Sequence, residues 1–228
     1  MTRIDVIRLA ENKYNRLLSV LVLGLLFYPF IDQNWVVGSI LILFFFLICL
    51  VTILLVIKEL EHSRQLFRHY IQLGVLFFIL RAASQLFTLP FSLNKLLSTA
   101  SAAIFLYFLG LSIYLILQEI FPTQTVKGDT IKGGICVYLL IGFFWANLYD
   151  MVYSFDPSAF RSLSEANKQA NLIYFSFTTL TTTGYGDIVP ISTLARAFAN
   201  VEAIVGVMYP AIFIARLVGL YSTQQHKE

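Results

Sequence analysis

Long apolar stretches separated by short polar segments set the pattern of this chain. A membrane-spanning helix needs about 20 mainly apolar residues. Six stretches fit this length to within a few residues, and they are 17–31, 35–57, 70–89, 96–117, 133–153 and 194–221. The pattern predicts an all-α integral membrane protein with six transmembrane helices. The first stretch is short and contains Pro29, and a secretory signal peptide is the alternative for it.

Composition places the chain in a bilayer as well. Of its 228 residues, 58% are hydrophobic and 13% are charged, whereas soluble domains carry about a quarter charged residues. The net charge of +3 is small and the basic residues form no stripe, so no nucleic-acid partner is expected. The apolar stretches hold no His-Glu-x-x-His or Gly-x-Ser-x-Gly motif, so we expect no enzyme.

Lysine and arginine collect on one side of the six predicted helices. The residues on that side are Arg3, Arg8, Lys13, Arg16, Lys58, Arg64, Arg68, Lys127 and Lys132. The opposite side has only Lys95, Arg161, Lys168 and Arg196. Because cytoplasmic loops carry the excess of positive charge, the distribution predicts a multi-pass protein of the cell membrane with both termini in the cytoplasm.

The polar loop 154–171 lies between the last two predicted helices, on the outer side. In it, Ser162 followed by Glu165 fits a capping box, which predicts a short helix from about 162 to 179. Such a helix would re-enter the membrane. Its C-terminal end, the negative end of the helix dipole, would favour a cation at the membrane centre.

Two glycines flank a tyrosine directly after this helix. The run 179–187 reads Thr-Leu-Thr-Thr-Thr-Gly-Tyr-Gly-Asp. Gly184 and Gly186 adopt left-handed conformations at low steric cost, which lets successive carbonyls point to one side. Carbonyl rings of this kind replace the hydration shell of K⁺. The run therefore predicts an ion filter, and a glycine turn that binds nothing is the alternative.

Residues 174–190 resemble the pore signature of potassium channels, Thr-x-x-Thr-x-Gly-Tyr-Gly, with the aspartate that often follows. The resemblance implies K⁺ as the transported ion and no organic cofactor. It further implies a selectivity filter formed by Thr182, Thr183, Gly184, Tyr185 and Gly186. Position 183 departs from the family pattern, which has Val or Ile there. Since one chain supplies one of the four strands of such a filter, a homotetramer is expected.

The same resemblance assigns support for the filter to the helix before it. Tyr174 and Thr178 match the positions that brace the aspartate Asp187 in potassium channels. Tyr174 is expected to donate a hydrogen bond to Asp187, whereas Thr178 lacks the acid that many channels carry at its position. A hydrated residue at the channel mouth is the alternative for Asp187.

Glu202 lies deep in the last predicted helix. An ionised side chain at this depth is expensive, so Glu202 should face protein or water and have a partner. The expected partners are hydroxyls behind the filter, such as those of Thr178, Thr179 or Thr181 of the same or a neighbouring chain. A direct ion ligand is the alternative role.

The last helix also carries two residues that weaken a helix, Gly206 and Pro210. Residues 202–220 resemble the inner helix of small bacterial potassium channels, in which Gly206 takes the position of the hinge. We therefore expect a gating hinge at these two residues. Close packing against another helix is the alternative for Gly206.

The first four helices share their layout with the sensor domain of voltage-gated cation channels, but they lack its charges. The fourth stretch holds no Lys or Arg, and Lys95 stands alone at its outer end. Since each gating charge contributes about 2.3 kcal/mol per 100 mV, we expect weak or absent voltage dependence. Arg81 is an intramembrane arginine, for which a lipid contact or a contact with the pore domain is the functional interpretation. A structural arginine that snorkels outward is the alternative.

These observations predict four parts. They are a sensor-like domain over 1–120, a cytoplasmic linker over 121–132, a pore domain over 133–221 and a short tail over 222–228. The predicted function is passive, K⁺-selective conduction, with further copies of the chain and membrane lipids as partners. A weakly selective cation channel and a non-conducting auxiliary membrane subunit are the alternatives.

Overall fold

The structure, a computed structural model, describes residues 13–27, 51, 64–86, 90–123, 126, 128–164 and 167–225. Within these residues the chain forms six α-helices, which are α2 (Lys13–Phe27), α4 (Arg64–Leu86), α5 (Phe91–Ile120), α6 (Gly128–Phe155), α7 (Lys168–Leu180) and α8 (Thr193–Gln225). A short 3-10 helix, η2 (Pro157–Ala159), and two strands of two residues, β1 (Phe160–Arg161) and β2 (Val189–Pro190), complete the described elements. The predicted all-α class is confirmed for this part of the chain.

Three of the described helices are long and apolar enough to cross a membrane. They cover Ser92–Ile120, Gly128–Phe155 and Thr193–Ser222, and they match the fourth, fifth and sixth predicted stretches. The apolar part of α2, Tyr14–Phe27, is shorter than these three spans. The second predicted stretch, 35–57, lies outside the described residues except for Val51.

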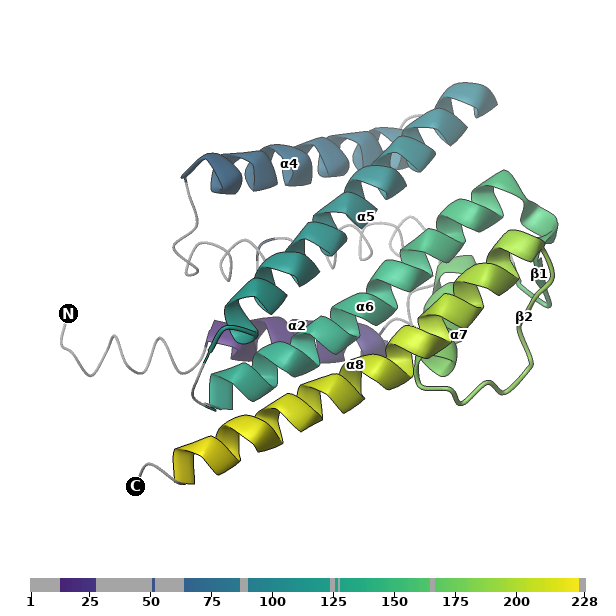
Figure 1. The fold of residues 1–228 in the computed structure, drawn as a ribbon. Coiled ribbons are helices and arrows are strands. Elements are labelled where there is room, and N and C mark those ends of the chain that lie inside the picture. Colours follow the sequence, from purple (N-terminus) through teal and green to yellow (C-terminus); the bar gives the residue numbers. More distant parts are fainter. Residues whose placement is uncertain are drawn as a thin grey trace.

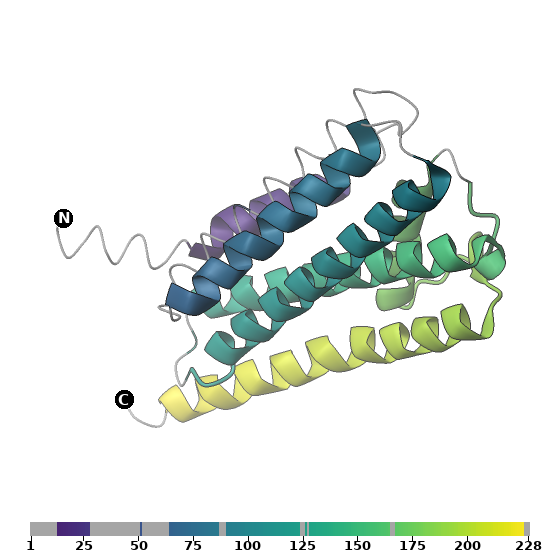
Figure 2. The same ribbon diagram turned by 90° about the horizontal axis from the view of Figure 1, so that it is seen from above.

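Helix α6 lies at the centre of the protomer and packs against α2, α5, α7 and α8. Figure 1 shows α5 crossing between α4 and α6, and Figure 2 shows α8 on one side of the bundle with α2 and α4 on the other. Two glycines of α6 permit the close packing. A Cβ at Gly134 would lie 2.1 Å from the Phe213 ring of α8, and one at Gly142 would lie 2.5 Å from the Phe177 ring of α7.

Two helix boundaries differ from the hydropathy pattern. Helix α6 begins at Gly128, so residues 128–132 of the predicted linker are helical. Asp129 lies in the first turn of α6, where a negative charge stabilises the positive end of the helix dipole. Helix α5 begins at Phe91, directly after Pro90, so that Lys95 lies inside the helix. Polar residues that a hydropathy window excludes thus extend both helices.

Helix α8 leaves most of its apolar surface uncovered in a single protomer. Only 11% of its candidate membrane span is buried, against 56% for α6. The exposed large side chains of α8 include Val201, Ile204, Val207, Met208, Ile212, Ile214 and Val218. This face is available to lipid or to further copies of the chain.

Candidate functional site: a pore helix and filter loop

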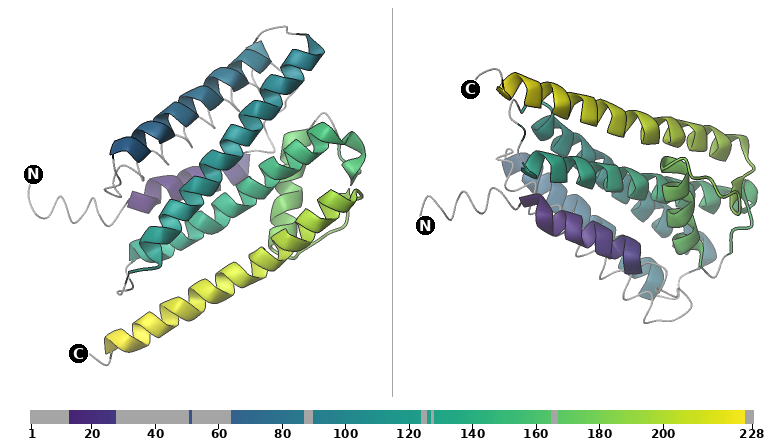
Figure 3. Two further views of the ribbon diagram at one scale, coloured as in Figure 1. Left: turned by 45° about the horizontal axis from the view of Figure 1, so that its top comes forward. Right: turned by 90° about the horizontal axis from the view of Figure 1, so that it is seen from below.

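Helix α7 is the element that positions the loop 181–187. It lies at one end of the α6–α8 pair (Figure 3) and packs against both helices. With 13 residues, it is shorter than a membrane span requires. Its buried face consists of Leu172, Phe175, Ser176 and Leu180. The Phe177 ring packs edge-on against Phe143 of α6, with ring centroids 5.5 Å apart.

The predicted start of this helix at Ser162 is wrong, because α7 begins at Lys168 after Asn167. Strand β1 pairs with β2 in an antiparallel register, with Phe160 opposite Pro190. This pairing holds the chain extended just before Ser162, whose φ is +65°. A left-handed residue that follows a paired strand cannot begin an α-helix, so the helix starts after the loop.

The loop 181–187 is exposed along its whole length, between the buried residues Leu180 and Ile188. Three of its residues have a positive φ, +57° at Thr182, +50° at Gly184 and +79° at Gly186. The two glycines adopt these angles at low cost. Thr182 is the exception, because residues other than glycine seldom adopt this left-handed conformation.

Hydrogen bonds to α7 fix the orientation of two carbonyls in this loop. The backbone N–H groups of Thr183 and Gly184 both donate to the Thr178 carbonyl, at 2.8 and 3.1 Å. In a trans peptide unit the N–H and the preceding C=O point in opposite directions, and the described chain has no cis peptide bond. The carbonyls of Thr182 and Thr183 therefore both point away from α7.

Thr178 supports the loop through its backbone. Its carbonyl accepts both of these loop amides, while its side-chain hydroxyl donates to the Phe175 carbonyl at 3.0 Å. A second hydroxyl contact lies within the loop, where Thr181 Oγ1 and Thr183 Oγ1 are 2.9 Å apart. The threonine at position 183 thus has a side-chain partner that a valine would lack.

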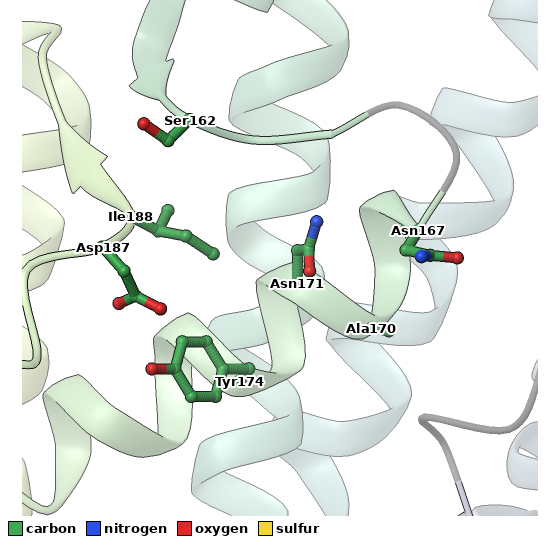
Figure 4. A pocket seen from close by; sticks show the side chains of 7 residues that line it. All are labelled: Ser162, Asn167, Ala170, Asn171, Tyr174, Asp187 and Ile188. Carbon is green, nitrogen blue, oxygen red and sulfur yellow. The ribbon is translucent and has the colours of Figure 1, made fainter.

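Tyr174 and Asp187 line a pocket of about 710 Å³ at the C-terminal end of the loop 181–187. The other lining residues are Ser162, Asn167, Ala170, Asn171 and Ile188. Figure 4 shows the Asp187 carboxylate and the Tyr174 ring near each other at one end of this pocket. The Tyr174 ring also stacks on Tyr185, with centroids 6.2 Å apart and planes 5° apart. The hydrogen bond between Tyr174 and Asp187 stays a prediction.

Glu202 of α8 is completely buried, where α8 faces α6 and α7. The Tyr149 hydroxyl of α6 donates to Glu202 Oε2 at 2.6 Å. The Ser176 hydroxyl of α7 lies 2.6 Å from Glu202 Oε1 and 2.8 Å from the Gly142 carbonyl. Glu202 therefore joins the inner helix to the pore helix and to α6 in one hydrogen-bonded cluster.

Within one protomer, the hydroxyl partners of Glu202 are Tyr149 and Ser176 instead of the expected threonines of 178–181, and the register of α7 against α8 explains the difference. A contact with these threonines of a neighbouring copy stays a prediction. Gly206 contacts the carbonyl of Leu180. Four residues earlier on each helix, Glu202 of α8 lies beside Ser176 of α7, as expected for two helices that run in the same direction at this contact. Sequence reasoning missed Ser176 and Tyr149, because the contact between Gly206 and Leu180 that sets this register is seen only in the structure.

Helix α8 passes through Gly206 and Pro210 as one continuous helix. A Cβ at Gly206 would lie 1.8 Å from the Leu180 carbonyl oxygen. The structure therefore shows the close packing that was the alternative for this glycine. A hinge at the same position stays a prediction.

Arg81 of α4 is half-buried, and the Asp150 carboxylate of α6 acts on it electrostatically. Asp150 also forms an ion pair with Lys168 at the start of α7, with Nζ and Oδ1 2.8 Å apart. The Lys168 ammonium lies 5.5 Å from the centre of the Tyr153 ring. Asp150 thus interacts with a cation of α4 and with Lys168, the first residue of α7.

Comparison with known proteins identifies the part of the chain that contains these residues. Residues 133–222 match the family model described as an ion channel. No curated protein and no solved structure matches the chain. The matched segment includes most of α6, the pore helix, the exposed loop and nearly all of α8. This agreement confirms the resemblance for that segment: residues 133–222 are an ion channel domain, in a multi-pass membrane protein that is not an enzyme.

Proposed function

We propose that the protein is a K⁺-selective channel whose filter is formed by residues 182–186. The orientation of two neighbouring carbonyls carries this proposal. Thr182 and Thr183 direct their C=O groups away from α7, because the next amides are tied to the Thr178 carbonyl. Carbonyl oxygens aimed at one side in succession are the ligands that replace the water shell of K⁺. The carbonyls of Gly184 and Tyr185 would continue the series.

The surface that one protomer leaves uncovered supports a homotetramer. Irregular backbone at membrane depth must be enclosed by protein or line a water-filled cavity, yet 181–187 is exposed along its whole length. Helix α8 likewise buries only 11% of its span. Four copies around one axis would face their filter loops inward and bury the apolar face of α8 against neighbouring copies.

The proposed topology has six membrane-spanning helices and both termini in the cytoplasm. Helix α2 begins and helix α8 ends at the same end of the molecule, opposite the 181–187 loop (Figure 1). The excess of Lys and Arg around the termini assigns this end to the cytoplasm. The filter then lies in the outer half of the membrane, with the C-terminal end of α7 directed at the central cavity.

Gating would use the lower part of α8. Gly206 is packed on Leu180, so the helix is fixed at that level, and Pro210 lies one turn further inward. Proline removes a helix hydrogen bond and clashes with the preceding turn, which makes bending around Pro210 less costly than elsewhere. Bending at 206–210 would move the inner end of α8 while leaving the filter in place.

Arg81 would connect the first domain to the pore domain. Its opposing charge is Asp150, whose carboxylate also pairs with Lys168 at the start of α7. A contact with the pore domain is therefore favoured over a lipid headgroup for Arg81. With Lys95 as the only Lys or Arg in α5, this connection would not make gating steeply voltage-dependent.

Potassium flux from liposomes tests the proposal. Gly184→Ala and Gly186→Ala force a side chain into a left-handed backbone, at a cost of about 1–2 kcal/mol per residue in each subunit, so both should abolish K⁺ flux. Gly219→Ala is the matched control, because a Cβ there meets nothing within 4 Å. Undiminished flux in both filter variants contradicts the proposal. Equal rates for Na⁺ and K⁺ in the wild type would favour the weakly selective cation channel.

A further inference from the structure

The buried cluster around Glu202 has more short contacts than an ionised carboxylate can satisfy. Three oxygen pairs lie within hydrogen-bonding distance. They are Tyr149 Oη with Glu202 Oε2 at 2.6 Å, Ser176 Oγ with Glu202 Oε1 at 2.6 Å and Ser176 Oγ with the Gly142 carbonyl at 2.8 Å. Each pair needs one hydrogen between its two oxygens.

A count of hydrogens decides the protonation of the cluster. The tyrosine and serine hydroxyls supply one hydrogen each, a carbonyl supplies none, and an ionised carboxylate supplies none. Two hydrogens would then serve three contacts, and either Glu202 Oε1 or the Gly142 oxygen would face Ser176 Oγ without one. A proton on Glu202 Oε1 supplies the third. Glu202 then donates to Ser176, Ser176 donates to Gly142, and Tyr149 donates to Glu202.

The surroundings of Glu202 also favour the neutral form. The titratable groups that face it are Tyr149 and Tyr138, both on α6, and α7 contributes the Ser176 hydroxyl. The described groups that contact the Glu202 carboxyl are hydroxyls, which carry no positive charge. An ionised carboxylate would thus be an unpaired charge inside a membrane protein, which costs several kcal/mol.

We infer that Glu202 is protonated in the conducting channel and that this proton fastens the pore helix to the inner helix. This inference rests on the proposed function and adds a positioning role to it. Ser176 lies one turn before Leu180 on α7, and the carbonyl of Thr178 between them holds the filter amides. Loss of the proton leaves one short contact without a hydrogen and places a charge behind the filter, which loosens α7 at this turn.

An infrared measurement tests the proton without requiring conduction. At neutral pH, the wild type should show the C=O stretch of a protonated buried carboxyl that is missing from Glu202→Gln. Identical spectra in this region overturn the inference. Should Glu202→Gln fail to fold, Ser176→Ala gives the same test, because it removes the acceptor and must shift the band. A band that Ser176→Ala leaves unchanged overturns the inference as well.

The pH profile of flux then tests the positioning role. Raising the pH should lower K⁺ flux and K⁺ over Na⁺ selectivity in the wild type, by about tenfold if one buried hydrogen bond is lost. Glu202→Gln keeps a donor of similar shape, so it should retain both quantities with a flat profile. If the wild type and Glu202→Gln show the same pH profile of flux, the positioning role of Glu202 is overturned. Absent flux in the wild type at every pH contradicts the channel proposal instead, while the infrared result still stands.

Discussion

Adding one methyl group at Gly206 should displace the end of the pore helix. The Cβ of Gly206→Ala would lie 1.8 Å from the Leu180 carbonyl oxygen and 2.7 Å from its carbonyl carbon. Contacts of a Cβ under 3.0 Å essentially never occur, so the two helices must separate by about 3.0 − 1.8 = 1.2 Å. The obstacle is backbone, which no side-chain rotation can relieve. The same carbonyl accepts a hydrogen bond from the Tyr138 hydroxyl at 3.3 Å, which the movement would stretch.

This displacement should reach the filter, because Thr181 and Thr182 follow Leu180 directly. Overpacking of this kind costs about 1–3 kcal/mol per site, and a homotetramer has the site in each subunit. We expect Gly206→Ala to lower the thermal stability of the assembly and to reduce selectivity for K⁺ over Na⁺. Thermal unfolding and reversal potentials in planar bilayers measure the two effects.

Gly219→Ala is the control on the same helix. Its Cβ would meet nothing within 4 Å, and alanine is favoured over glycine in a helix by about 1 kcal/mol. This variant should keep selectivity and lose no stability. If Gly206→Ala behaves like Gly219→Ala in both assays, the packing of α8 on α7 is not what positions the filter.

Three further predictions concern other residues. Thr183→Val should keep K⁺ selectivity, because the carbonyl remains, and lose about 1 kcal/mol of stability with the Thr181 hydroxyl contact of 2.9 Å; a reversal potential shifted towards zero would contradict this. Lys168→Met removes the 2.8 Å ion pair with Asp150 and should lower the free energy of unfolding by about 1.5–3 kcal/mol. Asp150→Asn and the double variant complete a double-mutant cycle. Additive losses of unfolding free energy would argue against the pairing. Since α5 carries only Lys95, open probability should change little across about 100 mV, and a steep activation curve would show a sensor elsewhere.

The hydropathy pattern located the described helices because a bilayer imposes their length. It placed the start of α6 too late, since Asp129 and Thr130 are polar residues that nevertheless join its first turns. The capping box at Ser162 and Glu165 placed the start of α7 too early, because the helix begins at Lys168. The pairing of Phe160 with Pro190, which fixes that boundary, joins residues far apart in the sequence and leaves no local pattern.

The candidate filter was identifiable from sequence because the two glycines and the preceding threonines lie in one run, and its role in ion selection stays a prediction. The partners of Glu202 were not identifiable, because they depend on how α7 and α8 slide against each other. The contact between Gly206 and Leu180 sets that register. The electrostatic interaction of Arg81 with Asp150 likewise depends on helix packing, which hydropathy does not encode.

The reversal potential of the wild-type channel tests the central claim most directly. Purified protein would be reconstituted in planar bilayers with KCl on one side and an equal concentration of NaCl on the other. If the carbonyls of Thr182 and Thr183 form a ring with those of other copies, the channel should select K⁺ over Na⁺. The reversal potential should then lie far from zero, with the sign expected for K⁺. A reversal potential at zero, from a pore that carries both ions equally, would contradict the account.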